Sequence, residues 1–241
     1  MRHRTRTRIL GALVAIVVVG GFTVASAASL GLSTRRLMGF NDRAVVAAPP
    51  IITCDNFAKP SIKGNLIDTR PVQLPAQCGT QIWAANSGTW KLTAGRANAS
   101  GANATITVNA GRTDVSAEAT FSNANSAGRV GGIAIAHSGG TTPRYLAAVL
   151  AGPNGVQLRL SNGTTVTTIA VGTATYGSTT RLRVTLLSGV VTVSLAGALV
   201  LSYTLTAAQL ATIAGNTRVG LYDDQGSVRF DDVLVTNAWA P

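Results

Sequence analysis

The sequence predicts an all-β protein made of two packed antiparallel sheets, and three observations support this fold class. The 241-residue chain is 46% hydrophobic but only 12% charged, which excludes coiled coils, charge-rich helical bundles and disordered chains. Apolar and polar side chains alternate with a period of two through most of the chain after residue 53, as expected for strands with one buried face. Turns rich in Gly, Asn, Ser and Thr separate about a dozen such segments.

Residues 113–121 show the alternation most clearly. Every second side chain is apolar and the intervening side chains are mostly polar, so we expect a strand with one face on the core and the other in water. The same argument applies to the later segments. The residues that we expect in the core are Val115, Ala117, Ala119, Phe121, Leu158, Leu182, Val184, Leu186, Leu221 and Phe230.

Further strands are expected wherever the alternation recurs between turn residues. Asn162-Gly163 and Ser188-Gly189 each separate two such segments, and Asn-Gly is a strong hairpin signal. The expected strands cover 81–86, 88–94, 104–108, 130–136, 144–150, 156–160, 164–170, 182–186, 191–195, 199–203, 217–222 and 227–236. One helix is expected at 207–213, because Thr206 can cap its start and Gly215 follows its end.

The N-terminal residues have the three regions of a secretory signal peptide. Residues 2–8 are basic, residues 9–24 are apolar, and Ala25-Ser26-Ala27 supplies the small side chains of a cleavage site. We therefore expect residues 1–27 to be a signal peptide. The alternative is an uncleaved anchor, because the uncharged residues 9–30 could cross a bilayer as a helix. In both cases the rest of the chain is exported, and it contacts the membrane only through residues 9–30 if the signal is retained.

The part of the chain that follows is expected to be a spacer and one domain. Residues 28–52 show no sustained period and contain Pro49-Pro50, so we expect a spacer there and a domain over 53–238. Cys54 and Cys78 form an even pair, which in an exported chain favours a disulfide. Their spacing is not that of a zinc site.

Short motifs occur in a distinctive order through the expected domain. They are Cys54-Asp55-Asn56-Phe57, Trp83, Gly88-Thr89-Trp90, Gly132-Ile133-Ala134-Ile135, Arg144-Tyr145, Arg181-Leu182-Arg183-Val184, Ala196-Gly197, Arg218-Val219-Gly220-Leu221 and Val228-Arg229-Phe230-Asp231-Asp232-Val233-Leu234-Val235. In this order the chain resembles the concanavalin A-like lectin/glucanase superfamily, in its laminin G-like branch of secreted bacterial proteins. The resemblance implies a two-sheet antiparallel jelly-roll sandwich, and roles in sugar binding, adhesion or glycoside hydrolysis among which the fold does not decide. The bias toward Arg, Ala and Gly indicates a high-GC bacterium such as an actinobacterium.

Residues suited to catalysis are scarce. The catalytic glucanases of this superfamily carry Glu-x-Asp-x-Glu on one strand, and no such motif occurs here. Asp114 and Glu118 share a strand face, but four residues at ~3.3 Å each separate them by ~13 Å, too far for a glycosidase pair. We expect both Glu118 and His137 to lie on wet surfaces, where substitution changes little. A glycoside hydrolase is therefore the least favoured interpretation.

Calcium is the one cofactor that the sequence leaves open. The adjacent pairs Asp223-Asp224 and Asp231-Asp232 are the acidic clusters of the expected domain, and calcium takes carboxylate oxygens at sites of this kind. The resemblance also implies a rim calcium, as laminin G-like domains often have one. The candidate ligands are Asp223, Asp224 and Asp231. The alternative for Asp231 and Asp232 is that these adjacent strand residues face opposite sides, and that one of them accepts a hydrogen bond from a neighbouring turn.

Sugar binding generally uses aromatic rings with polar neighbours. Trp83 and Trp90 lie on expected strands and are expected in the core, so the candidate ligand contacts are Arg144, Tyr145, Tyr176 and Tyr222. The leading interpretation is an exported, non-catalytic module that binds polysaccharide or glycoprotein at the cell envelope. The alternative is a structural envelope protein whose strand edges pair between copies. Most arginines beyond the N-terminal tail are scattered singly, so no nucleic-acid partner is expected.

Overall fold

The computed structural model describes residues 49–58, 67–72, 75–226 and 228–238. The signal peptide or anchor expected within residues 1–30, and nearly all of the spacer expected in 28–52, lie outside the described residues. Within the part that is described, no helix is long and apolar enough to cross a membrane.

Antiparallel strands make up most of the described chain, so the predicted all-β class is confirmed. In chain order the elements are β1 (Ile51–Asp55), α4 (Pro75–Cys78), β2 (Ala84–Thr93), β3 (Arg96–Asn109), β4 (Val115–Ser122), β5 (Val130–His137), β6 (Arg144–Ala151), β7 (Gly155–Asn162), β8 (Val166–Thr173), β9 (Thr179–Leu187), β10 (Val190–Leu195), β11 (Ala198–Thr204), α5 (Ala207–Ile213), β12 (Arg218–Asp223) and β13 (Arg229–Asn237). Strand β1 begins at Ile51, inside the range expected for the spacer.

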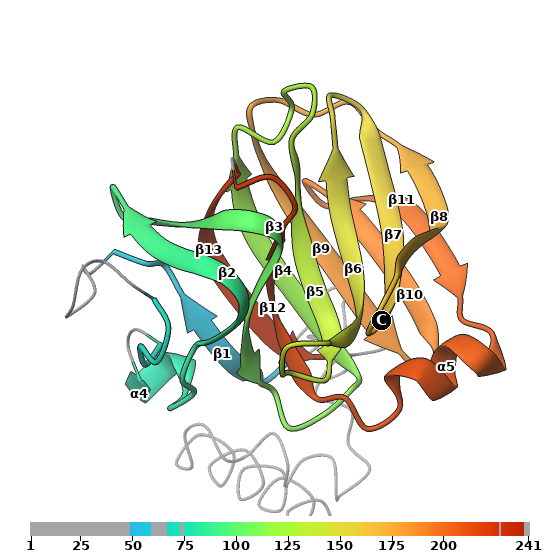
Figure 1. The fold of residues 1–241 in the computed structure, drawn as a ribbon, viewed down its shortest axis with the longest axis horizontal. Helices are drawn as coiled ribbons and strands as arrows, with labels where there is room; N and C mark the ends of the chain where they lie inside the picture. The colour runs from blue at the N-terminus through green and yellow to red at the C-terminus, as the bar shows by residue number, and fades with distance from the viewer. Residues whose placement is uncertain (1–48, 59–66, 73–74, 227, 239–241) are drawn as a thin grey trace, which may run out of the picture. The chain divides into compact units, whose positions relative to one another are not determined.

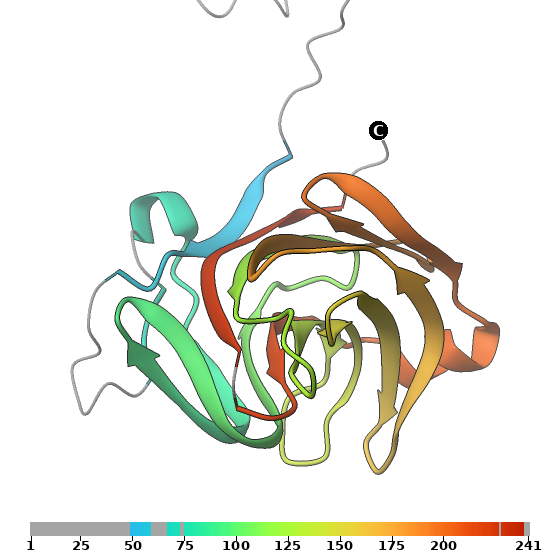
Figure 2. The same cartoon turned by 90° about the horizontal axis from the view of Figure 1, so that it is seen from above.

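The strands form two layers, which Figures 1 and 2 show from two directions. We call β2-β3-β12-β5-β6-β7-β8 the front sheet and β11-β10-β9-β4-β13, with β1 on the free edge of β13, the back sheet. Among the described residues, two residue pairs, Arg229 with Asn98 and Phe230 with Ala97, join the sheets through β13 and β3. The architecture is therefore the predicted two-sheet sandwich, linked along one side.

The hydrophobic core lies between the two sheets. All ten residues that the alternation placed in the core are at most 1% exposed. Trp83 and Trp90 are also buried, and Phe230 packs against both Trp90 and Phe121, with ring centroids 5.6 and 5.2 Å apart. The predictions for these side chains are confirmed, because a period of two assigns each of them to the inner face of its strand.

The β9–β10–β11 meander and helix α5 lie where the sequence predicts them. Ser188-Gly189 connects β9 to β10, and the residues of α5 are the predicted 207–213. Thr206 caps the helix in a capping box, in which its side chain accepts from the Gln209 backbone N–H and the Gln209 side chain accepts from the Thr206 backbone N–H.

The β2–β3 hairpin differs from the prediction. The sequence predicts two strands at 81–86 and 88–94 and a short one at 104–108, whereas β2 runs without a break through Gly88 and β3 begins at Arg96. Bulges on both sides of Ser87 keep β2 paired, and Gly88 sits at a φ of +70°. Because these interruptions are bulges, the glycine does not end the strand.

Gly220 in β12 packs so closely on β3 that a side chain does not fit. A Cβ built at this position would lie 1.9 Å from the Ile106 carbonyl oxygen and 2.7 Å from the Thr107 Cα. We expect Gly220→Ala to lower the free energy of unfolding by about 2 kcal/mol, because the central strands must shift apart. Urea denaturation measures this, with Gly177→Ala as the control, since its Cβ would meet nothing closer than 3.8 Å. Equal stabilities of the two variants would contradict the prediction.

Candidate functional site on the outer face of the front sheet

The front sheet carries a second, small apolar cluster on its outer face, the face turned away from the core. It consists of Ala134, Tyr145, Ala147, Val149 and Tyr222. Alternation explains it, because the neighbours of these residues on β5, β6 and β12 point into the main core. The rings of Tyr145 and Tyr222 lie 6.0 Å apart and are tilted by 49°.

A β-bulge at Ala136 brings His137 onto the same face. Ala136 has a φ of +46°, and the register between β5 and β12 shifts at this point. The extra residue reverses the alternation, so Ala136 joins the core and the His137 ring stacks on Tyr145, with centroids 5.2 Å apart and planes 9° apart.

The prediction that His137 lies on a wet surface is wrong, because the bulge turns it under its neighbours, where it is 0% exposed. Its Nδ1 accepts a hydrogen bond from the Gly139 N–H at 2.8 Å, and its Nε2 lies 3.3 Å from the Thr105 hydroxyl. The neutral tautomer with the proton on Nε2 satisfies both contacts. Burial, assisted by the nearby Arg218, lowers the pKa of His137 to about 3, so the ring is neutral at physiological pH.

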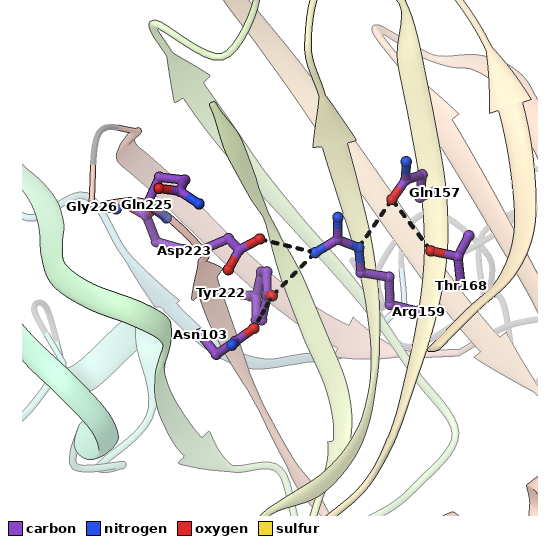
Figure 3. Close-up of polar contacts among 9 residues, drawn as sticks. Asn103, Gln157, Arg159, Thr168, Tyr222, Asp223, Gln225 and Gly226 are labelled. Atoms are coloured by element: carbon purple, nitrogen blue, oxygen red, sulfur yellow. Dashed lines mark hydrogen bonds and ion pairs between the residues drawn. The ribbon is translucent and has the colours of Figure 1, made fainter. Parts of the chain in front are cut away.

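Six polar side chains on the outer face of the front sheet form a connected network, which we call the outer polar cluster (Figure 3). Its members are Asn103, Gln157, Arg159, Thr168, Tyr222 and Asp224. The Arg159 Nη1 donates to the Tyr222 hydroxyl and to the Asp224 carboxylate, both at 3.3 Å. The Arg159 Nε donates to the Gln157 side-chain oxygen at 3.0 Å, and Thr168 reaches the same oxygen at 3.5 Å.

Hydrogen bonds within the protein hold the outer polar cluster in place, while two of its side chains remain partly exposed to solvent. The Tyr222 hydroxyl donates to the Asn103 side-chain oxygen at 2.6 Å, and burial, with Asp224 nearby, raises the pKa of Tyr222 to about 12, so the phenol keeps its proton. The Arg159 and Asp224 side chains are 17% and 21% exposed to solvent. They can therefore contact a ligand that settles on this face.

The sequence-predicted contact residues are only partly brought together. Tyr145 packs against Tyr222, which belongs to the outer polar cluster, but the two residues are 2% and 0% exposed, so neither ring offers an open face. Arg144 is exposed at the start of β6, in the strand register of the core-facing residues. Tyr176 lies apart, in the main core, with its hydroxyl bonded to the carbonyl oxygens of Gly152 and Gly155.

The three candidate calcium ligands serve different partners. Asp223 accepts from the backbone N–H groups of Gln225 and Gly226 at 3.2 and 2.9 Å, which closes the turn after β12. Asp224 pairs with Arg159, and Asp231 lies 3.9 Å from Arg96. No group of three or more His, Cys, Asp or Glu side chains in the described residues is arranged to hold a metal ion. The calcium site stays a prediction.

Sequence reasoning missed Arg159, Gln157 and Asn103. For Gln157 and Arg159 a signal was present, because they alternate with the core residue Leu158 and so must point outward from β7. Asn103 carries no such signal, since its position follows from a φ of +50° and from the pairing of β3 with β2.

Glu118 also departs from its prediction. It is 9% exposed rather than solvated, because Arg181 and Arg183 of β9 both close over its carboxylate on the outer face of the back sheet. The Arg183 Nε donates to Glu118 at 2.5 Å. The prediction that Glu118 lies on a solvent-exposed surface is wrong, because the neighbouring strand β9 places two arginine side chains directly beside it.

A pocket of about 200 Å³ lies between the β7–β8 hairpin and α5, but its polar side chains serve the protein itself. Asn162 accepts from the backbone N–H groups of Thr164 and Thr165, and Gln209 belongs to the capping box of α5. The outer polar cluster is the better candidate, because it combines a charged pair with amide and hydroxyl groups that solvent can reach.

No family model matches this chain, and no curated protein matches its sequence. Solved structures share its fold. The GH43 protein BlXynB from Bacillus licheniformis matches over 77% of this chain and 39% of its own, with a TM-score of 0.50 and 14% identity. A carbohydrate binding module, CBM66 from Bacillus subtilis, matches over 64% of this chain and 90% of its own, with a TM-score of 0.45 and 12% identity. The exoplasmic/lumenal domain of VIP36, in a Ca²⁺/Man3GlcNAc-bound form, covers 74% of this chain and 90% of its own, with a TM-score of 0.46 and 15% identity.

These similarities concern the fold alone, because sequence identities of 12% to 15% are too low for a function to be inferred from them. The likeness to BlXynB, at a TM-score of 0.50, agrees with the sandwich that the motif order implies. The laminin G-like branch and the actinobacterial source stay predictions.

Proposed function

We propose that this chain is an exported, non-catalytic carbohydrate-binding protein that engages polysaccharide or glycoprotein at the cell envelope through the outer polar cluster. The observation that carries the proposal is the network of Arg159, Asp224, Tyr222 and Asn103 on the outer face of the front sheet.

The chemistry of the outer polar cluster suits sugar hydroxyl groups. Each hydroxyl both donates and accepts hydrogen bonds, so it is recognised by donors and acceptors placed side by side. Arg159 supplies only donors, Asp224 supplies only acceptors, and Gln157 and Asn103 supply both. Because these side chains already hold one another, a ligand meets a preorganised surface, which reduces the entropic cost of binding.

The same cluster does not suit glycoside hydrolysis. Hydrolysis of this type requires two carboxyl groups flanking one bond, and Asp224 is the one carboxylate of the outer polar cluster. Its neighbour Asp223 turns its side chain into the loop that it stabilises. The Asp224 carboxylate forms an ion pair with Arg159 at 3.3 Å. A carboxylate held in this way suits ligand binding rather than hydrolysis.

The disulfide between Cys54 and Cys78 supports export. It ties β1 to α4, and disulfides persist in the oxidising conditions outside the cytosol. In the described part of the chain no cysteine is free.

Glycan binding by purified protein tests the proposal. A glycan array identifies the ligand, and calorimetry then compares the wild type with Arg159→Gln. We expect at least a tenfold loss of affinity, because the guanidinium makes charge-assisted hydrogen bonds. Arg183→Gln, which removes the same charge from the back sheet, is the matched control and leaves affinity unchanged.

Two results would contradict the proposal. One is the absence of saturable binding to any glycan, and the other is an equal effect of Arg159→Gln and Arg183→Gln. Thermal unfolding of both variants separates a loss of binding from a loss of folding.

Exposed apolar side chains on two edge strands favour a second candidate function, a structural envelope protein. Val171 on β8 and Leu199 on β11 are 65% and 64% exposed, and each strand ends its sheet. Neither edge has a paired strand within the described residues, and edges of this kind can pair with a second copy. Concentration-dependent filaments in electron microscopy, with no glycan bound, would favour this candidate over the first.

A further inference from the structure

The end of β12 opposite Tyr222 carries an arginine on the same face of the front sheet. Arg218, Gly220 and Tyr222 alternate along β12, and four residues at ~3.3 Å each place Arg218 ~13 Å from Tyr222 along the strand. Gly220 between them has no side chain. The outer face of β12 therefore connects the outer polar cluster to a second positive charge.

Arg218 has no carboxylate partner among the described residues. Its Nε donates to the Thr107 hydroxyl at 2.8 Å and its Nη2 donates to the Thr107 carbonyl oxygen at 3.1 Å. These two acceptors are neutral, and its Nη1 makes no hydrogen bond within the described part of the protein. Among the described residues, the arginines paired with a carboxylate are Arg70, Arg96, Arg159, Arg181 and Arg183.

Gly139 packs closely against the Arg218 side chain. A Cβ at Gly139 would lie 3.1 Å from the Arg218 Cδ, 3.7 Å from its Nε and 3.7 Å from the Asn86 side-chain oxygen, whereas a Cβ at Gly140 would meet nothing within 4 Å. The Asn86 amide nitrogen is fixed by the Thr107 hydroxyl at 2.9 Å. Because Gly139 has no side chain, its backbone can approach Arg218 this closely without placing a side chain over it.

A half-buried cation without a counter-ion is unfavourable by itself. Burial lowers the pKa of the Arg218 guanidinium, although arginine stays charged at neutral pH. The nearby His137 is neutral and offers no charge. A ligand anion would supply the missing counter-charge, and contacts between a guanidinium and anionic oxygens are among the stronger hydrogen bonds in proteins.

We propose that Arg218, flanked by Asn86 and Gly139, binds the anionic group of an acidic saccharide. This inference rests on the proposed function, because it adds a subsite to the same glycan-binding face. The group recognised is an anionic oxygen group carried by a sugar, either the carboxylate of a uronate or an ester of phosphate or sulfate. The outer polar cluster would hold hydroxyl groups of the same chain at the other end of β12.

Calorimetry of the full exported chain with matched oligosaccharides tests the proposal. The probes are a tetrasaccharide of galacturonic acid, its carboxyl-reduced neutral counterpart, and sulfated and phosphorylated forms of the neutral compound. We expect Arg218→Gln to weaken binding of the preferred acidic form at least tenfold, as expected for loss of a charge-assisted contact. Binding of the neutral form changes less than about twofold, because the outer polar cluster is intact.

Two further variants make the result decisive. Arg218→Lys keeps the charge and restores part of the preference for the acidic form, whereas Arg183→Gln, on the back sheet, leaves it unchanged. The acidic form that binds best identifies the anionic group. Equal affinity of the wild type for acidic and neutral forms would overturn the subsite alone, whereas failure to bind any glycan would overturn the proposed function with it.

Discussion

Asp55→Ala is expected to lower the free energy of unfolding by about 4 kcal/mol, in line with breaking a buried ion pair. The Asp55 carboxylate is 0% exposed and accepts from the Arg70 guanidinium and the Trp83 indole N–H, both at 2.8 Å. It also accepts from the Phe57 backbone N–H at 2.8 Å. The alanine leaves Arg70, whose side chain is 9% exposed, without its counter-ion. Urea denaturation followed by tryptophan fluorescence measures the loss.

Asp68→Ala is the matched control for this variant. Asp68 is an exposed aspartate that accepts one backbone hydrogen bond, from Ala85 at 2.9 Å. We expect its removal to cost no more than about 1 kcal/mol. Similar losses in the two variants would show that the Asp55 network does not hold β1 and the Trp83 segment to the domain.

Acid is expected to destabilise the protein through His137. The pKa of this ring is about 3 in the folded state, because of burial, against 6.5 when it is unperturbed. Between these values the unfolded chain binds a proton that the folded chain does not. The contribution to stability is therefore complete above pH 6.5 and is lost as the pH falls toward 3. From pH 7 to pH 4 the loss amounts to about 3 kcal/mol.

His137→Asn isolates this contribution from that of the carboxylates. An asparagine oxygen can accept from the Gly139 N–H in place of Nδ1 but does not titrate. The variant is less stable than the wild type at pH 7, because it leaves space beside Tyr145, and the difference shrinks by about 3 kcal/mol on going to pH 4. Denaturation curves at both pH values measure it. A difference that stays constant with pH would refute the role assigned to His137.

Local patterns were sufficient to predict the core and the helix. The inward set on β4, from Val115 to Phe121, follows from alternation within a single strand, and α5 follows from Thr206 and the apolar residues after it. These features depend on residues close together in the sequence, so the sequence displays them directly. The Cys54–Cys78 disulfide was predicted from composition and export, and the structure confirms it.

The candidate site depends on contacts that no local pattern contains. Arg159 meets Asp224 across 65 positions, and Tyr222 meets Asn103 across 119. The position of His137 depends on a one-residue bulge at Ala136, which alternation cannot reveal because a bulge reverses it. The polar N-terminal half of β3 lacks strand character and is extended through its pairing with β2, closed by Ala94-Gly95 at φ values of 50° and 71°.

The position of the last two strands governs how the domain can fold. Strand β12 lies between β3 and β5 in the front sheet, and β13 lies between β4 and β1 in the back sheet. Neither sheet is complete without β12 and β13, so a chain that emerges N-terminus first cannot complete its fold until these two strands have emerged. Because these central pairings join residues about a hundred positions apart, folding is expected to be slow relative to that of helical domains. During this interval the unpaired edges of β3 and β4 are exposed to other emerging chains.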